Sequence, residues 1–282
     1  MKIELQKIFF TLVIIIFLLV IWNTQILVYW KTLTVLLHES FHALVGFILG
    51  GSDISISLSS SESGTTFINN LSNFSIPFVV SAGYIGTILV GGFLLRVGFQ
   101  FFRAQIFTFI AGNWILITGI FLLEPRNFFF KFSLTLGLIF IIISLFSRLY
   151  SSLMLIFLSI TLLTYGIYDI SDILFNPENT DAGILAKYLI ENGILSGNLK
   201  NIAYNIGITW YVLNIFIIMY FMKFLFFGDK TGDFRIDRMI EMVNNGNVPK
   251  DVADWFLEKG KDLDGNPISL EKIDIMKRDK NE

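Results

Sequence analysis

Long apolar segments constrain this chain more than any other feature of its sequence. A helix of about 20 apolar residues covers the hydrocarbon thickness of a bilayer. Charged residues make up only 16% of the chain, below the roughly 25% of an average soluble domain. The sequence therefore predicts an all-α, polytopic membrane protein that lies in the lipid bilayer with about seven transmembrane helices. The expected spans are Ile8–Val28, Leu33–Leu49, Ile76–Val97, Gln105–Leu123, Phe132–Phe146, Leu153–Phe175 and Ile206–Phe227.

The charged residues are distributed unevenly along the chain. Of the 44 charged residues, 23 lie in positions 228–282. This division predicts a transmembrane domain over 1–227 and a soluble, charged tail of short helices over 228–282. The net charge of −2 provides no basic field, so we expect no nucleic-acid partner.

Two further patterns bear on the transmembrane domain. Residues 53–59 alternate between apolar and polar, and residues 64–68 follow a serine-rich turn, which predicts a small β-hairpin at a membrane face. The alternative is an ordinary polar loop. Glycines 83, 86, 91 and 92 in the third segment predict close helix packing.

The ionisable residues of the second segment predict a metal site. His38 and His42 are the only histidines of the chain, and they lie four residues apart. Positions i and i+4 share one face of a helix, so both imidazoles can bind one Zn²⁺. Glu39 can then reach the water on the zinc and act as a general base. The alternative is a buried polar cluster that holds helices together.

A catalytic zinc usually has three protein ligands and one open position. Because the chain has no cysteine and no third histidine, the third ligand should be a carboxylate. Asp169 and Asp172 are three residues apart near the end of the sixth segment, and we expect one of them to bind the metal. Depth in the segment favours Asp169. Asp172 could instead orient a histidine, or either residue could lie at the membrane surface.

Asp181 has a different expected role. Thr180 is suited to cap a helix over residues 181–192, and Gly193 follows the end of that helix. Asp181 would then interact favourably with the positive end of the helix dipole. We favour this structural role over a metal role for Asp181.

Taken together, these motifs resemble the M50 site-2-type intramembrane zinc metalloproteases, and within them the branch called peptidase M50B-like. The residues that carry the resemblance span roughly positions 8–227. They are the HExxH sequence of residues 38–42, Gly50-Gly51, the small-residue string 81–86, the aspartate region 168–170 and Thr180-Asp181-Ala182. Many members have glycine before the second histidine, whereas this chain has Phe41.

The resemblance implies an integral membrane, multi-pass protease in a cell or inner membrane. Its partners would be membrane-spanning or membrane-anchored polypeptide substrates, and its cofactor would be Zn²⁺. In this family a sheet lies beside the active site, where an exposed edge could bind an unwound substrate by strand addition. The rival interpretations are a non-catalytic membrane scaffold that keeps the metal site, and a transporter that uses the same ionisable residues.

Overall fold

A computed structural model gives the structure of the protein and describes residues 2–22, 24–59, 63–99, 101–168, 170–227, 242–244, 246–247 and 249–261. The first half contains helices α1 (Lys2–Ile21) and α2 (Gln25–Ile48), strands β1 (Ser52–Leu58) and β2 (Gly64–Asn69), the 3-10 turn η1 (Asn73–Ser75) and helices α3 (Ile76–Gly98) and α4 (Phe101–Leu122). The second half contains α5 (Phe128–Phe146), α6 (Arg148–Tyr168), α7 (Ile170–Phe175), η2 (Pro177–Asn179), α8 (Asp181–Glu191), α9 (Leu199–Phe227) and α11 (Lys250–Glu258).

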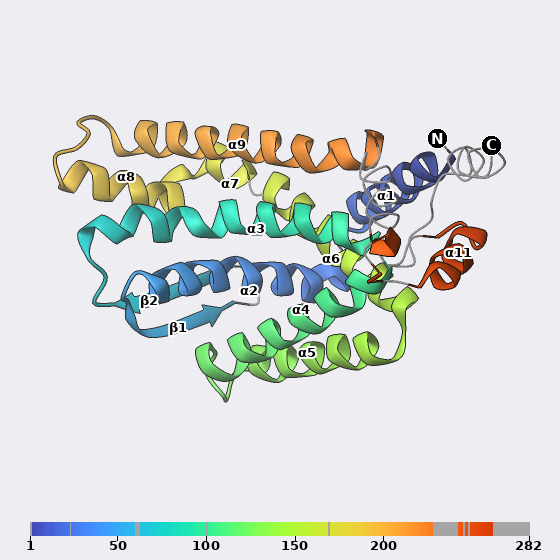
Figure 1. The fold of residues 1–282 in the computed structure, drawn as a ribbon. Helices are drawn as coiled ribbons and strands as arrows, with labels where there is room; N and C mark the ends of the chain where they lie inside the picture. The colour runs from blue at the N-terminus through green and yellow to red at the C-terminus, as the bar shows by residue number, and fades with distance from the viewer. Residues whose placement is uncertain are drawn as a thin grey trace.

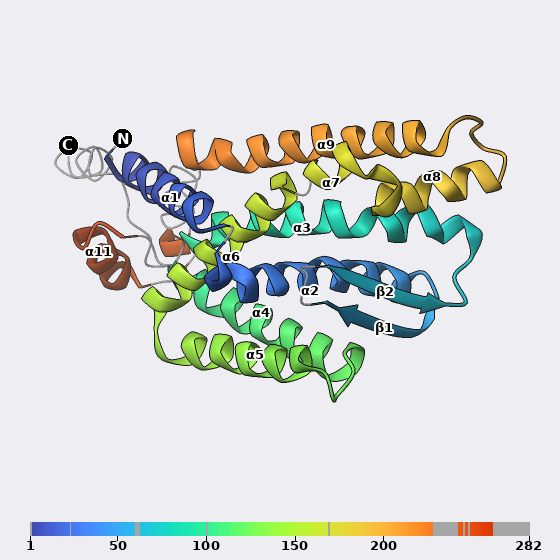
Figure 2. The same cartoon turned by 180° about the vertical axis from the view of Figure 1, so that it is seen from behind.

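Helix α3 lies in the middle of the molecule (Figures 1 and 2). It packs against α2, α6 and α9, while α4 and α5 pair with each other beyond α2 and α6. The short helix α8 packs between α3 and α9, so the start of α8 lies next to the central helices. The chain thereby brings the segment that follows α6 back toward α2.

Five of the described helical segments are long and apolar enough to cross a membrane. They cover Asn73–Gly98, Arg103–Leu122, Phe128–Phe146, Arg148–Phe175 and Leu199–Lys223. These segments agree with the last five of the seven spans predicted from the sequence. The structure therefore confirms an α-helical architecture with five candidate spans in its described part, but it does not confirm seven.

The two N-terminal helices differ from the prediction in their boundaries. The expected spans Ile8–Val28 and Leu33–Leu49 divide near residue 30, whereas α1 ends at Ile21 and α2 begins at Gln25. Thr24, in an extended conformation, precedes α2 and its hydroxyl donates to the Ile21 carbonyl at 2.6 Å. The break between the two helices is predicted too late in the chain because apolar residues continue on both sides of the turn.

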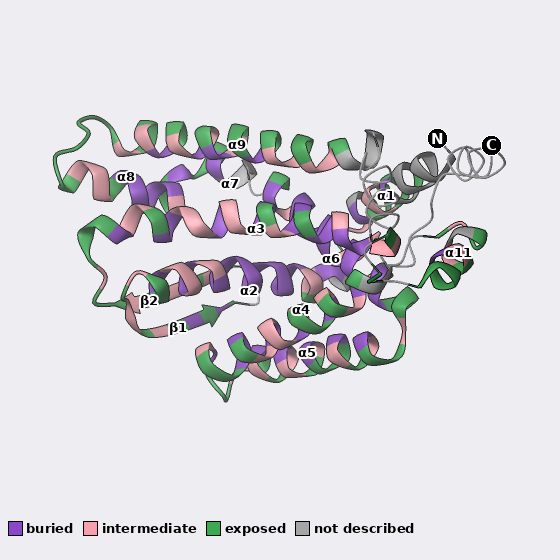
Figure 3. Cartoon of the chain, viewed as in Figure 1, coloured by how far each residue is buried: buried purple, intermediate pink, exposed green. Residues whose placement is uncertain are grey.

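Helix α2 is not among the five candidate spans, although it has 24 residues. Its mean hydropathy is lowered by Lys31, His38, Glu39 and His42. Every residue from 31 to 40 is nevertheless buried, so α2 is enclosed by protein along its middle (Figure 3). A polar helix in this position is shielded from lipid by its neighbours.

The outward faces of the other helices are strongly apolar. Large apolar side chains are exposed on α4 and α5, among them Ile117, Phe121, Leu138, Ile142 and Phe146. Water-soluble proteins seldom expose an apolar surface of this extent. These faces are suited to contact lipid, whereas the buried residues lie toward α2, α3 and α6 (Figure 3).

The predicted hairpin is present as a two-stranded antiparallel sheet. Ile56 pairs with Thr66, and Leu58 pairs with Gly64. Ile56 and Leu58 are buried, whereas the alternate residues Ser55 and Ser57 are exposed, as the alternating sequence predicts. The sheet packs on α2, and Ile56 also forms a parallel bridge to Leu123 at the end of α4.

The tail is described only in part. Helix α11 follows Pro249 and ends before Gly260, which has a positive φ of 64°. This agrees with the short helices predicted for the tail. Residues 228–241 and 262–282 lie outside the described residues, so the division of the chain at position 228 stays a prediction.

The packing of α5 predicts a contrast between two phenylalanines on that helix. Phe140 is fully buried in the core cluster around α4 and α6, whereas Phe146 is 83% exposed. Phe140→Ala should lower the free energy of unfolding by about 3 kcal/mol, because the cavity loses van der Waals contacts. Phe146→Ala, the control, should change it by less than about 1 kcal/mol. Thermal unfolding of the detergent-purified variants would measure both, and equal effects would contradict this packing.

Candidate metal centre

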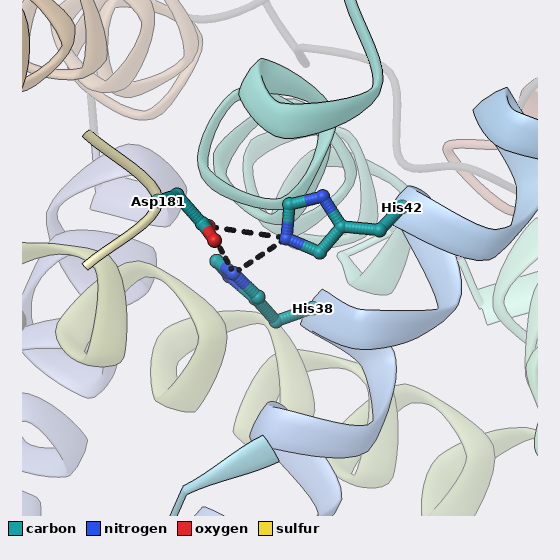
Figure 4. A group of neighbouring side chains, drawn as sticks. All are labelled: His38, His42 and Asp181. Atoms are coloured by element: carbon teal, nitrogen blue, oxygen red, sulfur yellow. Dashed lines mark hydrogen bonds and ion pairs between the residues drawn. The ribbon is translucent and has the colours of Figure 1, made fainter. Parts of the chain in front are cut away.

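Two histidines on α2 and one aspartate from α8 come together in the interior (Figure 4). His38 and His42 lie one helical turn apart and are both buried. Their Nε2 atoms are 3.1 Å apart. Asp181 Oδ2 lies 3.2 Å from Nε2 of His38 and 3.1 Å from Nε2 of His42. Three potential ligand atoms therefore form a nearly equilateral triangle.

The ring of His42 is oriented by a backbone contact. Its Nδ1 lies 2.6 Å from the carbonyl oxygen of Val79 on α3. A carbonyl only accepts hydrogen bonds, so Nδ1 carries the proton and donates it. In the neutral ring this tautomer leaves the lone pair of Nε2 to bind a metal ion, which is the arrangement that metal-binding histidines show when their other nitrogen is held.

The ring of His38 is held by aromatic contacts. It meets the ring of Tyr84 edge to face, with centroids 5.1 Å apart, and Tyr165 lies on a further side at 6.2 Å. Tyr84 in turn stacks on Trp210 of α9 at 5.4 Å. These contacts restrict the imidazole to one orientation in an otherwise apolar surrounding.

Asp181 is the first residue of α8, as expected from the sequence. Ala182 and Leu185 of α8 pack with Tyr84 and Trp210 in one buried cluster, which fixes the start of the helix. Thr180 precedes the helix in an extended conformation, but its hydroxyl donates to the Pro177 carbonyl at 2.8 Å instead of capping α8.

The ionised form of Asp181 is favoured in this setting. Burial opposes ionisation, but the positive charge of His42 in its protonated form and the hydrogen bonds from the two rings outweigh it. Together they hold the pKa of the Asp181 carboxyl well below its usual range. A carboxylate must be ionised to bind a metal ion, so Asp181 is in the required form at neutral pH.

The triangle fits a tetrahedral zinc ion. Zinc binds histidine nitrogen and carboxylate oxygen at roughly 2.0–2.2 Å, which puts neighbouring ligand atoms about 3.3 Å apart in a tetrahedron. The three separations observed here are 3.1–3.2 Å. Two neutral imidazoles and one carboxylate are also a donor set typical of catalytic zinc, with a fourth position free for water. The residues present therefore fit the metal.

The space in front of the two Nε2 atoms depends on Gly83 of α3. A Cβ atom on residue 83 would overlap with Nε2 of both His38 and His42. Gly83 was expected from the sequence to serve close helix packing. The structure adds that its missing side chain keeps the ligand atoms accessible.

Glu39 lies beside the histidines but not in the triangle. It is 7% exposed, and its Oε2 accepts a hydrogen bond from the Thr66 hydroxyl of β2 at 2.6 Å. On the other side of Glu39, Ser40 accepts a hydrogen bond from Trp114 Nε1 of α4 at 2.8 Å. Residues 39 and 40 are thus held by two different elements that pack on α2.

Phe41 lies directly before the second histidine, where many members of the family that this chain resembles have glycine. Its ring packs against Gly86 of α3, where an added Cβ would lie 2.7 Å from Phe41 Cγ. The bulky side chain is therefore accommodated by a glycine on the facing helix, and α2 and α3 still approach closely.

The structure describes only one of the three aspartates well enough to place its carboxylate relative to the histidines. Asp169 lies outside the described residues. Asp172 lies on the short helix α7, and its side chain also lies outside what the structure describes. Asp181 is the carboxylate that the structure brings to both histidines. From the sequence we favour an interaction of Asp181 with the helix dipole over a metal role. The Thr180-Asp181-Ala182 string is nevertheless one of the motifs that carry the family resemblance.

The fold and the candidate metal site together indicate the class of protein. In its described part the fold has five apolar helical segments long enough to span a bilayer, and two histidines of α2 and one aspartate of α8 form a cluster that could hold a metal ion. The chain belongs to the Peptidase M50B-like family, whose model matches residues 11–222. No curated protein and no solved structure matches the chain. The family and the apolar helices indicate an integral membrane protein and a membrane peptidase.

The contact at residue 83 generates a prediction about metal binding. Gly83→Ala should reduce zinc bound by the purified protein at least tenfold, because the new methyl group fills the space before both Nε2 atoms. Gly91→Ala on the same helix is the control, since the atoms nearest to its Cβ would be those of Leu162 and Leu163, at 3.1 Å. Atomic emission analysis of zinc per chain measures the effect. Wild-type zinc content in Gly83→Ala would show that the metal binds elsewhere.

Proposed function

We propose that the protein is a zinc metalloprotease that acts in the membrane. The observation that carries the proposal is the triangle of His38, His42 and Asp181, with Glu39 next to the first histidine. We propose these three residues as zinc ligands and Glu39 as the catalytic base. When bound, Zn²⁺ would polarise the scissile carbonyl and lower the pKa of its water toward neutrality.

The chain's own residues would contribute the remaining steps. Glu39 would take a proton from the attacking water and later give it to the leaving amine. His42, held through Val79, and Asp181 would keep the metal position fixed while the substrate changes shape. The apolar surroundings of the site would exclude bulk water, which strengthens each of these electrostatic interactions.

Membrane proteins are the substrates that best suit this arrangement. The site lies between helices whose outward faces are apolar, so a polypeptide would reach it from the lipid or from the membrane surface. The family membership supports the same substrate class. We therefore propose membrane-spanning or membrane-anchored polypeptides as substrates.

Zinc content identifies the third ligand. We expect about one zinc per chain in the wild type, and its loss in His42→Ala and Asp181→Ala, because two remaining ligands bind the ion weakly. Asp169→Ala and Asp172→Ala should keep the metal. If either of these variants lost zinc while Asp181→Ala kept it, the third zinc ligand would be Asp169 or Asp172, as the sequence predicts.

Removal of the base tests the reaction. Glu39→Gln should lower the cleavage rate by at least about 10³-fold, since a positioned general base contributes roughly 10²–10⁴-fold. It should keep its zinc. The measurement compares new protein N-termini, detected by mass spectrometry, after membranes are incubated with proteoliposomes of wild type or Glu39→Gln. Equal cleavage by both would refute the mechanism, and absence of cleavage with zinc bound would favour a scaffold.

A further inference from the structure

The contact between the hairpin and Glu39 carries a further inference. We propose that Thr66 of β2 is a positioning residue for the catalytic base, and that Gly64 provides the space in which the base is held. This inference rests on the proposed function, because it concerns the group that would move the proton. It gives the hairpin a role in the reaction itself.

The first observation is the hydrogen bond from Thr66. Its hydroxyl lies 2.6 Å from Oε2 of Glu39 and 3.0 Å from the backbone carbonyl oxygen of the same residue. A hydroxyl has one proton to donate, and an ionised carboxylate is the stronger acceptor. Thr66 therefore holds Oε2 and sets the orientation of the whole carboxylate.

The second observation is the space at Gly64, two residues before Thr66 on the same face of β2. A Cβ atom on Gly64 would lie 2.6 Å from Cγ and 2.8 Å from Oε1 of Glu39. The strand backbone thus packs directly against the side chain of the base. A glutamate has three rotatable side-chain bonds, and the combined contacts with Gly64 and Thr66 restrict it to one conformation.

The third observation is that the hairpin is itself anchored. Thr66 pairs with Ile56 of β1, and Ile56 is 4% exposed and bridges to Leu123 at the end of α4. The same helix α4 holds the residue after the base through the bond from Trp114 to Ser40. The strand that donates and the helix that carries Glu39 are therefore tied to neighbouring points of the chain, the first through Leu123 just after α4 and the second through Trp114 of α4.

The chain offers a set of matched variants. Thr66→Val removes the hydroxyl but keeps the branched shape that suits a strand, and Thr66→Ser restores the hydroxyl. Thr65→Val is the control, because Thr65 is exposed on the opposite face of the same strand. Gly64→Ala tests the space beside the base by a second route, so the inference does not depend on the folding of one variant.

The experiment measures kcat, KM and zinc content in proteoliposomes, with a fluorogenic peptide built on the strongest cleavage site found for the wild type. Thr66→Val should lower kcat about 10–100-fold, as expected for loss of a hydrogen bond to a charged group, with KM and zinc unchanged within twofold. Thr66→Ser should recover kcat to within about threefold of the wild type. Thr65→Val should be unchanged, and Gly64→Ala should lower kcat and keep zinc.

Two outcomes would overturn the inference while leaving the proposed function intact. One is wild-type kcat in both Thr66→Val and Gly64→Ala while Glu39→Gln is inactive. The other is equal loss of activity in Thr66→Ser and Thr66→Val, which would assign Thr66 a structural role only. Cleavage by Glu39→Gln would instead remove the proposed function, and the role of Thr66 with it.

Discussion

The arrangement of this molecule depends on one close approach, that of the Asp181 carboxylate to two imidazoles 143 and 139 positions earlier in the chain. Three such groups do not lie within 3.2 Å of one another in an apolar interior without compensation, since each loses its hydration. The packing of α3 and α8 brings these three groups together. Helix α3 presents glycines to α2, and α8 returns between α3 and α9 so that its first residue meets the histidines.

The fold could be predicted from the sequence wherever one local pattern decides the structure. Five apolar segments and the alternating hairpin are predicted at the observed places in the chain, because segment length and side-chain period are local properties. Helices α5, α6 and α9 nevertheless begin four to seven residues earlier than predicted. The break between α1 and α2 was misplaced. Asn23, Thr24 and Gln25 are polar but uncharged, and three such residues are averaged away when hydropathy is taken over a window as long as a span.

The site was predictable in part for the same reason. His38, Glu39 and His42 belong to about one turn of a helix, so their spacing in the sequence predicts their relative positions. Asp181 belongs to another element, and its position in the first turn of a predicted helix has an adequate local explanation in the helix dipole. A residue with two compatible roles cannot be assigned from its neighbours in sequence, and only the packing of α8 on α3 and α9 brings its carboxylate to the histidines.

We propose above that one zinc ion is bound by two imidazoles and one carboxylate. X-ray absorption at the zinc edge of the purified wild-type protein tests it most directly. We expect four nitrogen or oxygen neighbours at roughly 2.0–2.1 Å, with outer-shell scattering from two imidazole rings. A spectrum with no imidazole scattering, or a protein that binds no zinc when zinc is supplied, would contradict it.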